Sequence, residues 1–392
     1  MSEELHFFES PTRHWAVALP FRLEALLADW GQLRQAMVRR MAGEFSRHEW
    51  AYLISFLDPH NLRRPFLESF GTPVAAAAAD VLARPRGPVA VWLPSNVSLL
   101  GPLTLVLLSL TGNRLRLKAS SRGDDLTEAF LNFARGNLPH GPLQECLCRQ
   151  VQLEQFDRHD PRNAEMAQEA GCRIIFGSDE AAESVVRLDH PADSTAVVFS
   201  DRRSEAWLEP AAVDDGAVET LVKVFAIYGQ AGCTSPSRVV LLGGTPDDVR
   251  HLRERVLQAW PRIVRRDPPI HVASQNVLAR QWAAVLGWDA VLTARNGAVL
   301  AAGTIDLPRP ASLMFLPIVA ADRDQAARSV PANIQTIGHA LGDAGDAAWL
   351  GLLARTPVKR FVPLGRMHHF GPTWDGWEFW RGMFEIMTVE AN

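Results

Sequence analysis

One cysteine of this chain has the surroundings that a nucleophile requires. The segment Gly229-Gln-Ala-Gly-Cys-Thr-Ser-Pro-Ser-Arg238 places Cys233 after several small residues, between a helical stretch and a strand. A thiolate that attacks a substrate carbonyl must be approachable, whereas a buried structural cysteine needs no glycine-rich approach. The segment therefore indicates a nucleophile, although taken alone it leaves a structural cysteine open as the alternative.

Two predicted strand ends carry polar side chains suited to charge or cofactor binding. The run Leu93-Pro-Ser-Asn96 delivers an amide from a strand into the start of a helix, where Asn96 either caps the helix or donates to a developing oxyanion. The run Leu117-Lys-Ala-Ser-Ser-Arg122 ends a second strand in a polar cluster. Its polar members are Lys118, Ser120, Ser121 and Arg122. Such a cluster suits the ribose and 2′-phosphate of an adenine dinucleotide, and a solvated loop is the alternative.

A third junction has the features of a phosphate site. Phe176-Gly177-Ser178 ends a strand and begins a helix, and Ser178 supplies a small hydroxyl at the helix N-terminus. Free backbone N–H groups and the helix dipole both favour an anion at such a position.

Other sequence signatures of enzymes are missing. There is no G-x-G-x-x-G, no Walker A loop, no G-x-S-x-G and no H-E-x-x-H motif, and Gly243-Gly244 matches an ordinary strand-to-helix turn. Cys146 and Cys148 have no second cysteine pair, and His368 and His369 have no partner at ligand spacing. We therefore predict no metal site and interpret both histidines as structural.

The composition is that of an ordinary folded protein with two domains or two lobes. The chain has 392 residues, of which 47% are hydrophobic and 21% charged, and its net charge is -4. Without a basic run, a nucleic-acid-binding protein is disfavoured. Four cysteines make no disulfide framework, and the longest apolar run, about residues 97–110, is interrupted and too short for a bilayer. The acidic N-terminus does not match a signal peptide, so we predict a cytoplasmic protein without a membrane span.

The hydrophobic pattern predicts helices first and then strands alternating with helices. Leu23, Leu26, Leu27 and Trp30 recur at helical spacing within a mostly helical region over residues 1–83. Short apolar runs predict strands at 89–93, 114–118, 145–151, 173–176, 195–199 and 238–242. Helices are expected between them, at about residues 99–110, 124–135, 179–186, 216–228 and 247–260. The alternation predicts the α/β class, with a mostly parallel sheet covered on both faces.

Two segments carry no predicted helix or strand. Residues 200–215 form a polar stretch, and residues 353–392, rich in Trp, Pro and Gly, are expected to pack irregularly. The small apolar run at residues 74–79, by contrast, is expected to continue the helical region before it.

Together and in this order, the chemical segments resemble those of the aldehyde dehydrogenase superfamily. The specific resemblance is to its acyl-CoA reductase branch, the LuxC-type fatty acyl-CoA reductases of bacterial bioluminescence and related pathways. It covers about residues 89–380. Its motifs are Leu93-Pro-Ser-Asn96, Gly112-Asn113, Leu117-Lys118, Ile175-Phe-Gly-Ser178 and Cys233-Thr-Ser-Pro-Ser-Arg238. Arg360-Phe-Val-Pro-Leu-Gly365 and Trp374-Asp-Gly376 resemble that branch in particular.

The resemblance implies a role for each segment. Cys233 is the nucleophile that attacks the acyl thioester, and Asn96 together with the backbone N–H of Cys233 stabilises the oxyanion. Lys118 holds the adenosine ribose, while Gly177 and Ser178 lie under the pyrophosphate of the dinucleotide.

The resemblance also bears on the choice of cofactor. The superfamily binds its dinucleotide without G-x-G-x-x-G, so the absence of that motif does not count against a nicotinamide cofactor. Ser120, Ser121 and Arg122 stand where NAD-preferring relatives often carry a Glu, which would repel a 2′-phosphate. We therefore expect NADPH, with NADH as the alternative.

The chain also departs from the superfamily. Oxidative members carry a Glu-Leu-Gly-Gly segment whose Glu activates the hydrolytic water, and here the aligned residues are Asp189-His190-Pro-Ala192. Reduction needs no hydrolytic water, so this loss fits acyl reduction better than aldehyde oxidation. His190 either takes and returns the thiol proton or merely precedes a proline in a polar turn. The Glu that grips the nicotinamide ribose has no clear counterpart near residues 313–318. The stretch over 200–215 is longer than in most members of the superfamily. Its candidate roles are to hold a partner or to shape the acyl entrance.

We therefore predict an oxidoreductase that converts an acyl thioester to an aldehyde. Cys233 attacks the carbonyl and expels the thiol carrier, CoA or an acyl-carrier protein, and hydride then gives a thiohemiacetal that collapses to the aldehyde. The expected fold is aldehyde-dehydrogenase-like. It comprises a helical N-terminus with a Rossmann-like cofactor domain over 1–200, an α/β catalytic domain over 201–350, and a C-terminal segment, 351–392, that packs back on the cofactor domain.

Partners and alternative functions follow from the same resemblance. It implies a homo-oligomer, and an acyl-activating enzyme is a candidate partner. One alternative is an acyl-Cys233 transferase or thioesterase without hydride transfer, which failure to bind a dinucleotide would support. The other is a scaffold with reduced catalysis that binds an acyl-activating partner, but full loss of activity would be expected to erode Cys233 and its small-residue approach, and both are intact.

Overall fold

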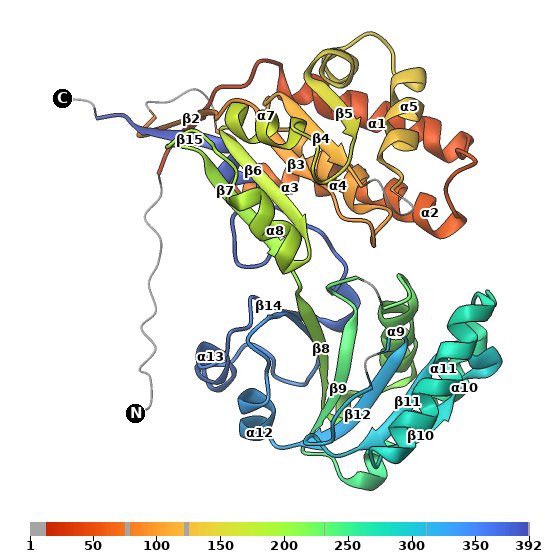
Figure 1. Cartoon of the computed structure of the whole chain (residues 1–392). Coiled ribbons are helices and arrows are strands. Elements are labelled where there is room, and N and C mark those ends of the chain that lie inside the picture. Colours follow the sequence, from red (N-terminus) through yellow and green to blue (C-terminus); the bar gives the residue numbers. More distant parts are fainter. Residues whose placement is uncertain (1–12, 75–78, 121–124, 231, 311, 391–392) are drawn as a thin grey trace. The chain divides into compact units, whose positions relative to one another are not determined.

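The computed structural model describes residues 13–74, 79–120, 125–230, 232–310 and 312–390. Over these residues the chain divides into two units (Figure 1). We call residues 13–201 and 370–390 the terminal unit, and residues 202–369 the central unit. The boundaries fall at 201/202 and 369/370, where the sequence analysis expected 200/201 and 350/351.

The main sheet of the terminal unit has five parallel strands. They are β3 (Val89–Trp92), β4 (Leu115–Ala119), β5 (Val151–Gln155), β6 (Cys172–Gly177) and β7 (Thr195–Ser200). Their order is β5-β4-β3-β6-β7, so the direction in which successive strands are added reverses at β3. In doubly wound folds ligands bind at such a reversal, outside the carboxyl ends of the strands. The predicted α/β class with a parallel sheet is confirmed.

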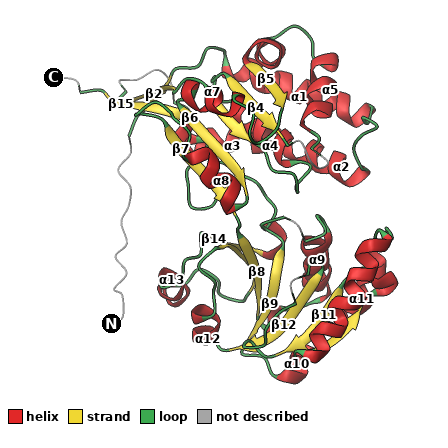
Figure 2. Ribbon diagram, viewed as in Figure 1, coloured by secondary structure: helices red, strands yellow, loops and turns green. Residues whose placement is uncertain are grey.

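Helices pack against this sheet and contribute a large part of the core of the unit (Figure 2). They are α1 (Leu23–Arg39), α2 (Arg47–Phe56), α3 (Pro59–Phe70), α4 (Leu100–Ser109), α5 (Thr127–Asn137), α6 (Pro142–Glu145), α7 (Arg162–Glu169) and α8 (Asp179–Val186). The helix predicted from the leucine spacing is confirmed by α1, which buries Leu26, Leu27 and Trp30. The run at 74–79 lies largely outside the described residues.

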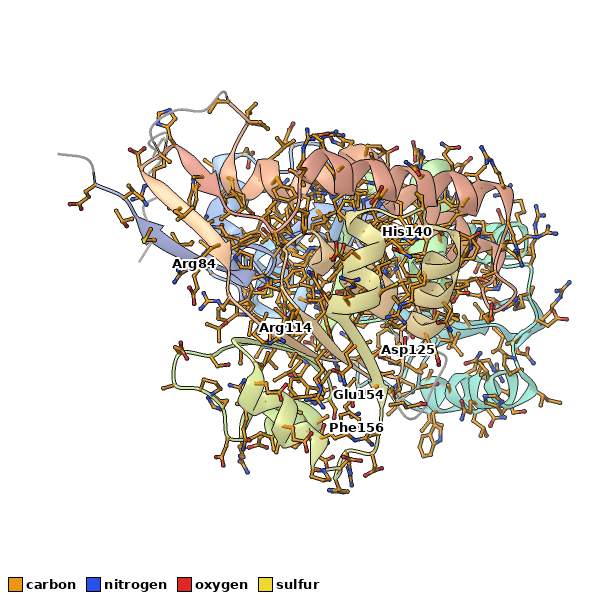
Figure 3. The ribbon with its side chains drawn as sticks, turned by 90° about the horizontal axis from the view of Figure 1, so that it is seen from above. Arg84, Arg114, Asp125, His140, Glu154 and Phe156 are labelled. Carbon is orange, nitrogen blue, oxygen red and sulfur yellow. The ribbon has the colours of Figure 1, made fainter. Side chains whose placement is uncertain are left out.

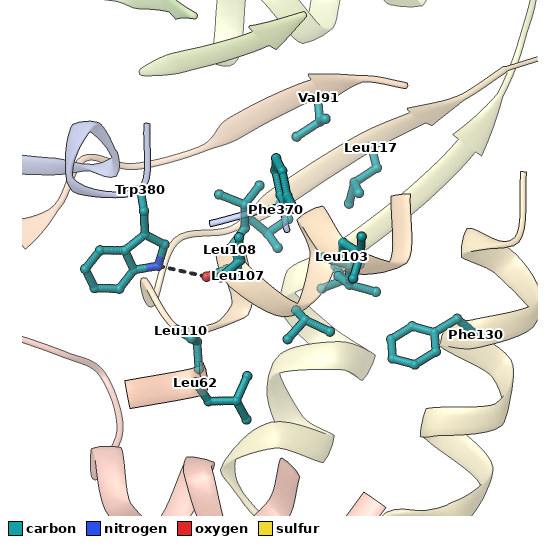
Figure 4. Close-up of a cluster of buried hydrophobic side chains, with 14 of the residues drawn as sticks. Leu62, Val91, Leu103, Leu107, Leu108, Leu110, Leu117, Phe130, Phe370 and Trp380 are labelled. Atoms are coloured by element: carbon teal, nitrogen blue, oxygen red, sulfur yellow. Dashed lines mark hydrogen bonds between the residues drawn. The ribbon is translucent and has the colours of Figure 1, made fainter. Parts of the chain in front are cut away.

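The C-terminal segment belongs to this core. α4 is apolar all round and buried, as expected of a helix in the centre of a domain. The indole Nε1 of Trp380 donates to the Leu107 carbonyl of α4 at 2.9 Å (Figure 4). Phe370 and Trp380 also share one hydrophobic cluster with α4 and the strands of the main sheet.

A second, three-stranded sheet corrects the expectation of irregular structure at the C-terminus. It has the order β1-β2-β15, with β1 (Trp15–Val17), β2 (Val81–Pro85) and β15 (Phe384–Thr388). β15 runs antiparallel to β2. Arg86 donates to the Phe384 carbonyl and Asn113 to the Met383 carbonyl, at 3.1 Å and 3.0 Å, so side chains far away in the sequence fix the entry to β15. No local pattern in residues 353–392 carries that information.

The strand predicted at 145–151 is also wrong. α6 ends at Glu145, a π-helical turn follows over Cys146–Gln150, and β5 begins only at Val151. The guanidinium of Arg135 donates to the carbonyls of Leu147, at 2.6 Å, and Val151, at 3.2 Å. Carbonyls at a helix end lack intrahelical partners, so this arginine stabilises the helical turn where the apolar run alone suggested a strand.

The central unit contains a seven-stranded sheet in the order β10-β11-β12-β9-β8-β13-β14. The strands are β8 (Arg203–Leu208), β9 (Pro236–Leu242), β10 (Asp289–Leu292), β11 (Val299–Gly303), β12 (Phe315–Ala321), β13 (Ile334–Ala340) and β14 (Arg360–Pro363). All neighbours are parallel except β10 and β11. Over the parts of the chain described, no helix has both the length and the apolarity needed to cross a bilayer.

Two separate cores lie on the two faces of this sheet. The helices are α9 (Asp215–Ala226), α10 (Pro246–Ile263), α11 (Ile270–Val285), α12 (Arg323–Arg328) and α13 (Ala347–Ala354). α9 and α10 pack in one cluster, and α11, α12 and α13 contribute to the other. The helices predicted at 216–228 and 247–260 are confirmed.

β8 lies inside the sheet, although the sequence predicted only a polar stretch there. That prediction is wrong because the charge of Glu205 is paired and not solvated. Glu205 is 1% exposed and accepts from the guanidinium of Arg238 in β9, itself 3% exposed, at 2.8 Å. Pairing offsets much of the cost of placing a charge in the core and so permits a strand that local polarity conceals.

This pairing predicts an asymmetric cost of mutation. Arg238→Ala removes the hydrogen-bonded cation of a buried carboxylate and should lower the free energy of unfolding by about 3–5 kcal/mol, whereas replacing both partners with apolar residues should cost much less. Arg355→Ala is the control, because Arg355 and Asp324 are both more than half exposed and 3.7 Å apart. It should cost under about 1 kcal/mol. Urea denaturation measures all three, and equal stability of Arg238→Ala and Arg355→Ala would contradict the argument.

Candidate active site

The terminal unit gathers the predicted binding residues at the carboxyl edge of its main sheet. The Leu93 N–H donates to the Lys118 carbonyl at 3.0 Å, so pairing continues one residue beyond β3 before the chain turns toward α4. Asn96 lies exposed in this turn. Lys118 is the next-to-last residue of β4, and Gly177 is the last residue of β6. Parallel pairing therefore brings these strand ends to the edge where the strand order reverses.

Lys118 is a half-buried cation at this edge. Its ammonium lies 5.4 Å from the centre of the Phe156 ring. Phe156 follows β5 (Figure 3). Burial lowers the pKa of Lys118, and the Asp157 carboxylate opposes part of that shift. The Ser120 carbonyl accepts from the Gln155 side chain at 2.8 Å and ties the end of β4 to β5. Ser121 and Arg122 lie outside the described residues.

The N-terminus of α8 is already engaged by a carboxylate. Ser178 accepts from the Ala181 N–H at 3.2 Å and caps the helix. The Asp179 N–H donates to the Asp201 carboxylate at 2.7 Å, and the Ser200 hydroxyl donates to the Asp179 carboxylate at 2.6 Å. Asp201 thus holds one of the N–H groups that the sequence analysis predicted for a pyrophosphate, as the helix dipole favours for any anion.

Cys233 lies in the central unit, in a tight turn between α9 and β9. The Ser235 N–H donates to the Gly232 carbonyl at 2.9 Å, so Cys233 is the first central residue of a β-turn. Ser204 of β8 donates to the Cys233 carbonyl at 2.7 Å, and Ser237 donates to the Ser204 carbonyl at 2.9 Å. Cys233 itself is partly exposed. A partly exposed cysteine whose backbone is fixed by a neighbouring strand suits a nucleophile.

Gln230 anchors the chain just before the turn. Its backbone has φ 60°, and its side chain pairs with the backbone of Phe315 in β12 through both amide atoms, each at 3.1 Å. The same amide nitrogen donates to the Pro236 carbonyl at the start of β9, at 3.2 Å. One side chain therefore ties the approach to Cys233 to the ends of two sheet strands.

His368 lies against the residue that follows the nucleophile. Its Nδ1 is 2.6 Å from the hydroxyl of Thr234, and its Nε2 is 2.6 Å from the Val224 carbonyl near the end of α9. The ring is buried, and burial lowers its pKa to about 4. The interpretation of His368 as structural is therefore incomplete, because its contacts reach the Cys233 turn.

His190 belongs to the terminal unit and is exposed. Its Nδ1 lies 2.7 Å from the Leu188 carbonyl, in a turn after α8. Of the two interpretations left open by the sequence, this contact matches the polar turn. A role in proton transfer stays a prediction.

In the terminal unit, parallel pairing brings the strand-end residues to one edge of the sheet. In the central unit, the turn of Cys233 is held by residues that the sequence analysis missed. Those residues are Ser204, Gln230, Thr234 and His368. Gln230 and Thr234 lie in the quoted Cys233 segment, but Ser204 lies in the unrecognised β8, and His368 is 134 positions from Thr234 with no sequence signal linking them. In the described ranges, no group of three His, Cys, Asp or Glu residues is placed to hold a metal ion.

Comparison with known proteins identifies a family that covers nearly the whole chain. The family model for acyl-CoA reductase (LuxC) matches residues 5–383. A comparison with curated proteins gives no match.

Solved structures with a similar fold are aldehyde dehydrogenases and related oxidoreductases. A mutant of aldehyde dehydrogenase C from Pseudomonas syringae, with NAD+ and octanal, is 12% identical, with a TM-score of 0.62 over 94% of this chain and 84% of that chain. An oxidoreductase from Marinobacter aquaeolei is 12% identical, with a TM-score of 0.66 and the same coverage. An NAD-dependent benzaldehyde dehydrogenase from Corynebacterium glutamicum is 14% identical, with a TM-score of 0.61 over 94% and 83%. They confirm the predicted aldehyde-dehydrogenase-like fold.

The four cysteines should differ sharply in reactivity. Burial raises the pKa of Cys146 to about 12 and also raises that of Cys172, so neither forms thiolate near neutral pH. Iodoacetamide should therefore modify Cys148, which is exposed, and Cys233, and should spare the other two. Peptide mass spectrometry measures the labelling, with urea-unfolded protein as the control in which all four react. Rapid labelling of Cys146 in the folded protein would contradict this assignment.

Proposed function

The chain belongs to the acyl-CoA reductase (LuxC) family, and we propose that it reduces an acyl thioester to an aldehyde through an acyl-Cys233 intermediate, with NADPH as reductant. The proposal rests on the turn that contains Cys233. Ser204 holds the backbone of this turn, and Cys233 itself is partly exposed. A CoA thioester is the substrate we propose, with an acyl-carrier-protein thioester as the alternative.

The acyl-transfer step involves only the thioester substrate and residues of this chain. The Cys233 sulfur bonds to the thioester carbon, and the carrier sulfur leaves with the electron pair of the broken C–S bond and takes up a proton. Ser204 and Gln230 hold the turn so that the sulfur meets the carbonyl in one geometry. The backbone N–H of Cys233 and the amide of Asn96 are the proposed donors to the oxyanion. When bound, the nicotinamide supplies hydride to the acyl group, and Cys233 is released as the aldehyde forms.

We assign dinucleotide binding to the carboxyl edge of the main sheet in the terminal unit. The reversal of strand order and the half-buried cation of Lys118 support this assignment. The run from Lys118 to Arg122 contains no carboxylate, which favours NADPH over NADH. The residues proposed to hold the cofactor are Lys118, Ser120, Ser121, Arg122, Gly177 and Ser178.

Replacing the nucleophile tests the proposal directly. Cys233→Ala should abolish the loss of NADPH absorbance on addition of acyl-CoA, measured over a series of chain lengths, because no acyl-enzyme forms. Cys148→Ala is the matched control and should retain the wild-type rate, because Cys148 is the other exposed thiol and has no proposed role. Thioester-dependent oxidation that persists in Cys233→Ala would contradict the proposal.

The hydride-free alternative is favoured by one observation. The contact of Asp201 with the N-terminus of α8 opposes a pyrophosphate there. An acyl-Cys233 transferase or thioesterase would release CoA from acyl-CoA without any oxidation of NADPH.

Neutralising Asp201 distinguishes the two functions. Asp201→Asn removes the competing charge and should tighten NADPH binding by about two- to ten-fold, as followed by NADPH fluorescence. Asp193→Asn, the same charge change at an exposed position, should leave the affinity unaltered. Binding by neither the wild type nor Asp201→Asn would favour the hydride-free alternative, and binding without a gain would place the pyrophosphate away from α8.

A further inference from the structure

The motif Arg360-Phe-Val-Pro-Leu-Gly365, which the sequence marked only by resemblance, has no role in the proposed reaction. Its first residue lies in β14, and its guanidinium donates to the Thr336 hydroxyl of β13 at 3.0 Å. The same group donates to the carbonyls of Met367 and His369, each at 3.2 Å. Arg360 therefore fixes the backbone on both sides of His368. A planar guanidinium reaches several acceptors in one geometry, which an ammonium does not.

The two contacts of the His368 ring define its protonation. The Val224 carbonyl only accepts, so Nε2 carries a proton. With a pKa lowered to about 4, the ring is neutral near pH 7, and Nδ1 accepts from the Thr234 hydroxyl. The nearby Arg360 charge also lowers this pKa. The Tyr228 ring packs edge-on against the imidazole at 5.2 Å.

These contacts connect the Cys233 turn to two other elements. Val224 is among the last residues of α9, whose carbonyls have no partner within the helix, and His368 supplies a donor there. Thr234 is the second central residue of the turn that contains Cys233. A shift of Thr234 must therefore move Cys233 with it.

We propose that His368 is a positioning residue for Cys233: held by Arg360, its ring ties Thr234 to the end of α9 and fixes the turn from which the nucleophile attacks. The inference rests on the proposed role of Cys233. Misplacing a reacting group by about 1 Å costs on the order of 100-fold in rate, so the connection acts on the acylation step.

The experiment measures acylation without NADPH, as CoA released in a single turnover after mixing with acyl-CoA. Thr234→Val keeps the side-chain shape and removes the hydroxyl. Arg360→Lys keeps the positive charge and loses the planar set of donors that reaches both carbonyls. Both variants should slow acylation by about ten-fold or more and leave the acyl-CoA concentration that gives half-maximal acylation within about two-fold. Thr234→Ser restores the hydroxyl and should recover most of the lost rate. Thr356→Val removes a comparable hydroxyl bond, to the Leu353 carbonyl at 2.8 Å, and should leave the rate unaltered.

The outcomes separate this inference from the proposed function. If Cys233→Ala still releases CoA at the wild-type rate, the proposed function fails. If Cys233→Ala is inactive but Thr234→Val and Arg360→Lys acylate like the wild type, only the positioning role fails. A lower melting temperature in Thr234→Val with a normal acylation rate at low temperature would likewise overturn it, because that is the result of a purely structural contact.

Discussion

The pairing of Glu205 with Arg238 is the interaction on which the surroundings of Cys233 depend. Both charges are buried, so neither is tolerated without the other, and together they fix β8 beside β9. Ser204 immediately precedes Glu205 and holds the Cys233 carbonyl. Cys233 lies shortly before Arg238 on the chain that enters β9. The pair that permits a charged strand in the middle of the sheet therefore also sets the distance between the nucleophile and its support.

The two units use opposite ends of their parallel strands. In the terminal unit the candidate residues follow the strands, where helix N-termini present N–H groups and favour anions. In the central unit Cys233 precedes its strand and follows the end of α9, where carbonyls are left without donors. The supports of Cys233 match that difference. Ser204 donates to the Cys233 carbonyl and His368 donates to the Val224 carbonyl, so each satisfies an acceptor while it holds the turn.

The sequence was sufficient where local patterns carry the information. The leucine spacing of α1, four of the five strands of the main sheet in the terminal unit, β9 and the Cys233 segment were recognisable, and so was the fold to which they belong. It was insufficient where distant residues decide. Glu205 reads as solvent-exposed until Arg238 is placed beside it, the turn after α6 depends on Arg135, and the contact of His368 with Thr234 joins segments that share no pattern. The competition of Asp201 for the start of α8 likewise appears only when β7 and α8 are adjacent.

Histidine meets both hydrogen-bonding requirements of its position beside Thr234. The position needs one donor to the Val224 carbonyl and one acceptor from the Thr234 hydroxyl, both in one rigid plane. Neutral imidazole supplies both, whereas lysine and arginine only donate. A protonated ring would donate from both nitrogens and force the Thr234 hydroxyl to turn its proton away. Burial disfavours that state, so the low pKa and the direction of the Thr234 hydrogen bond have one cause. Arg360 fixes the backbone on both sides of the imidazole, and its charge adds to the effect of burial in lowering the pKa of His368.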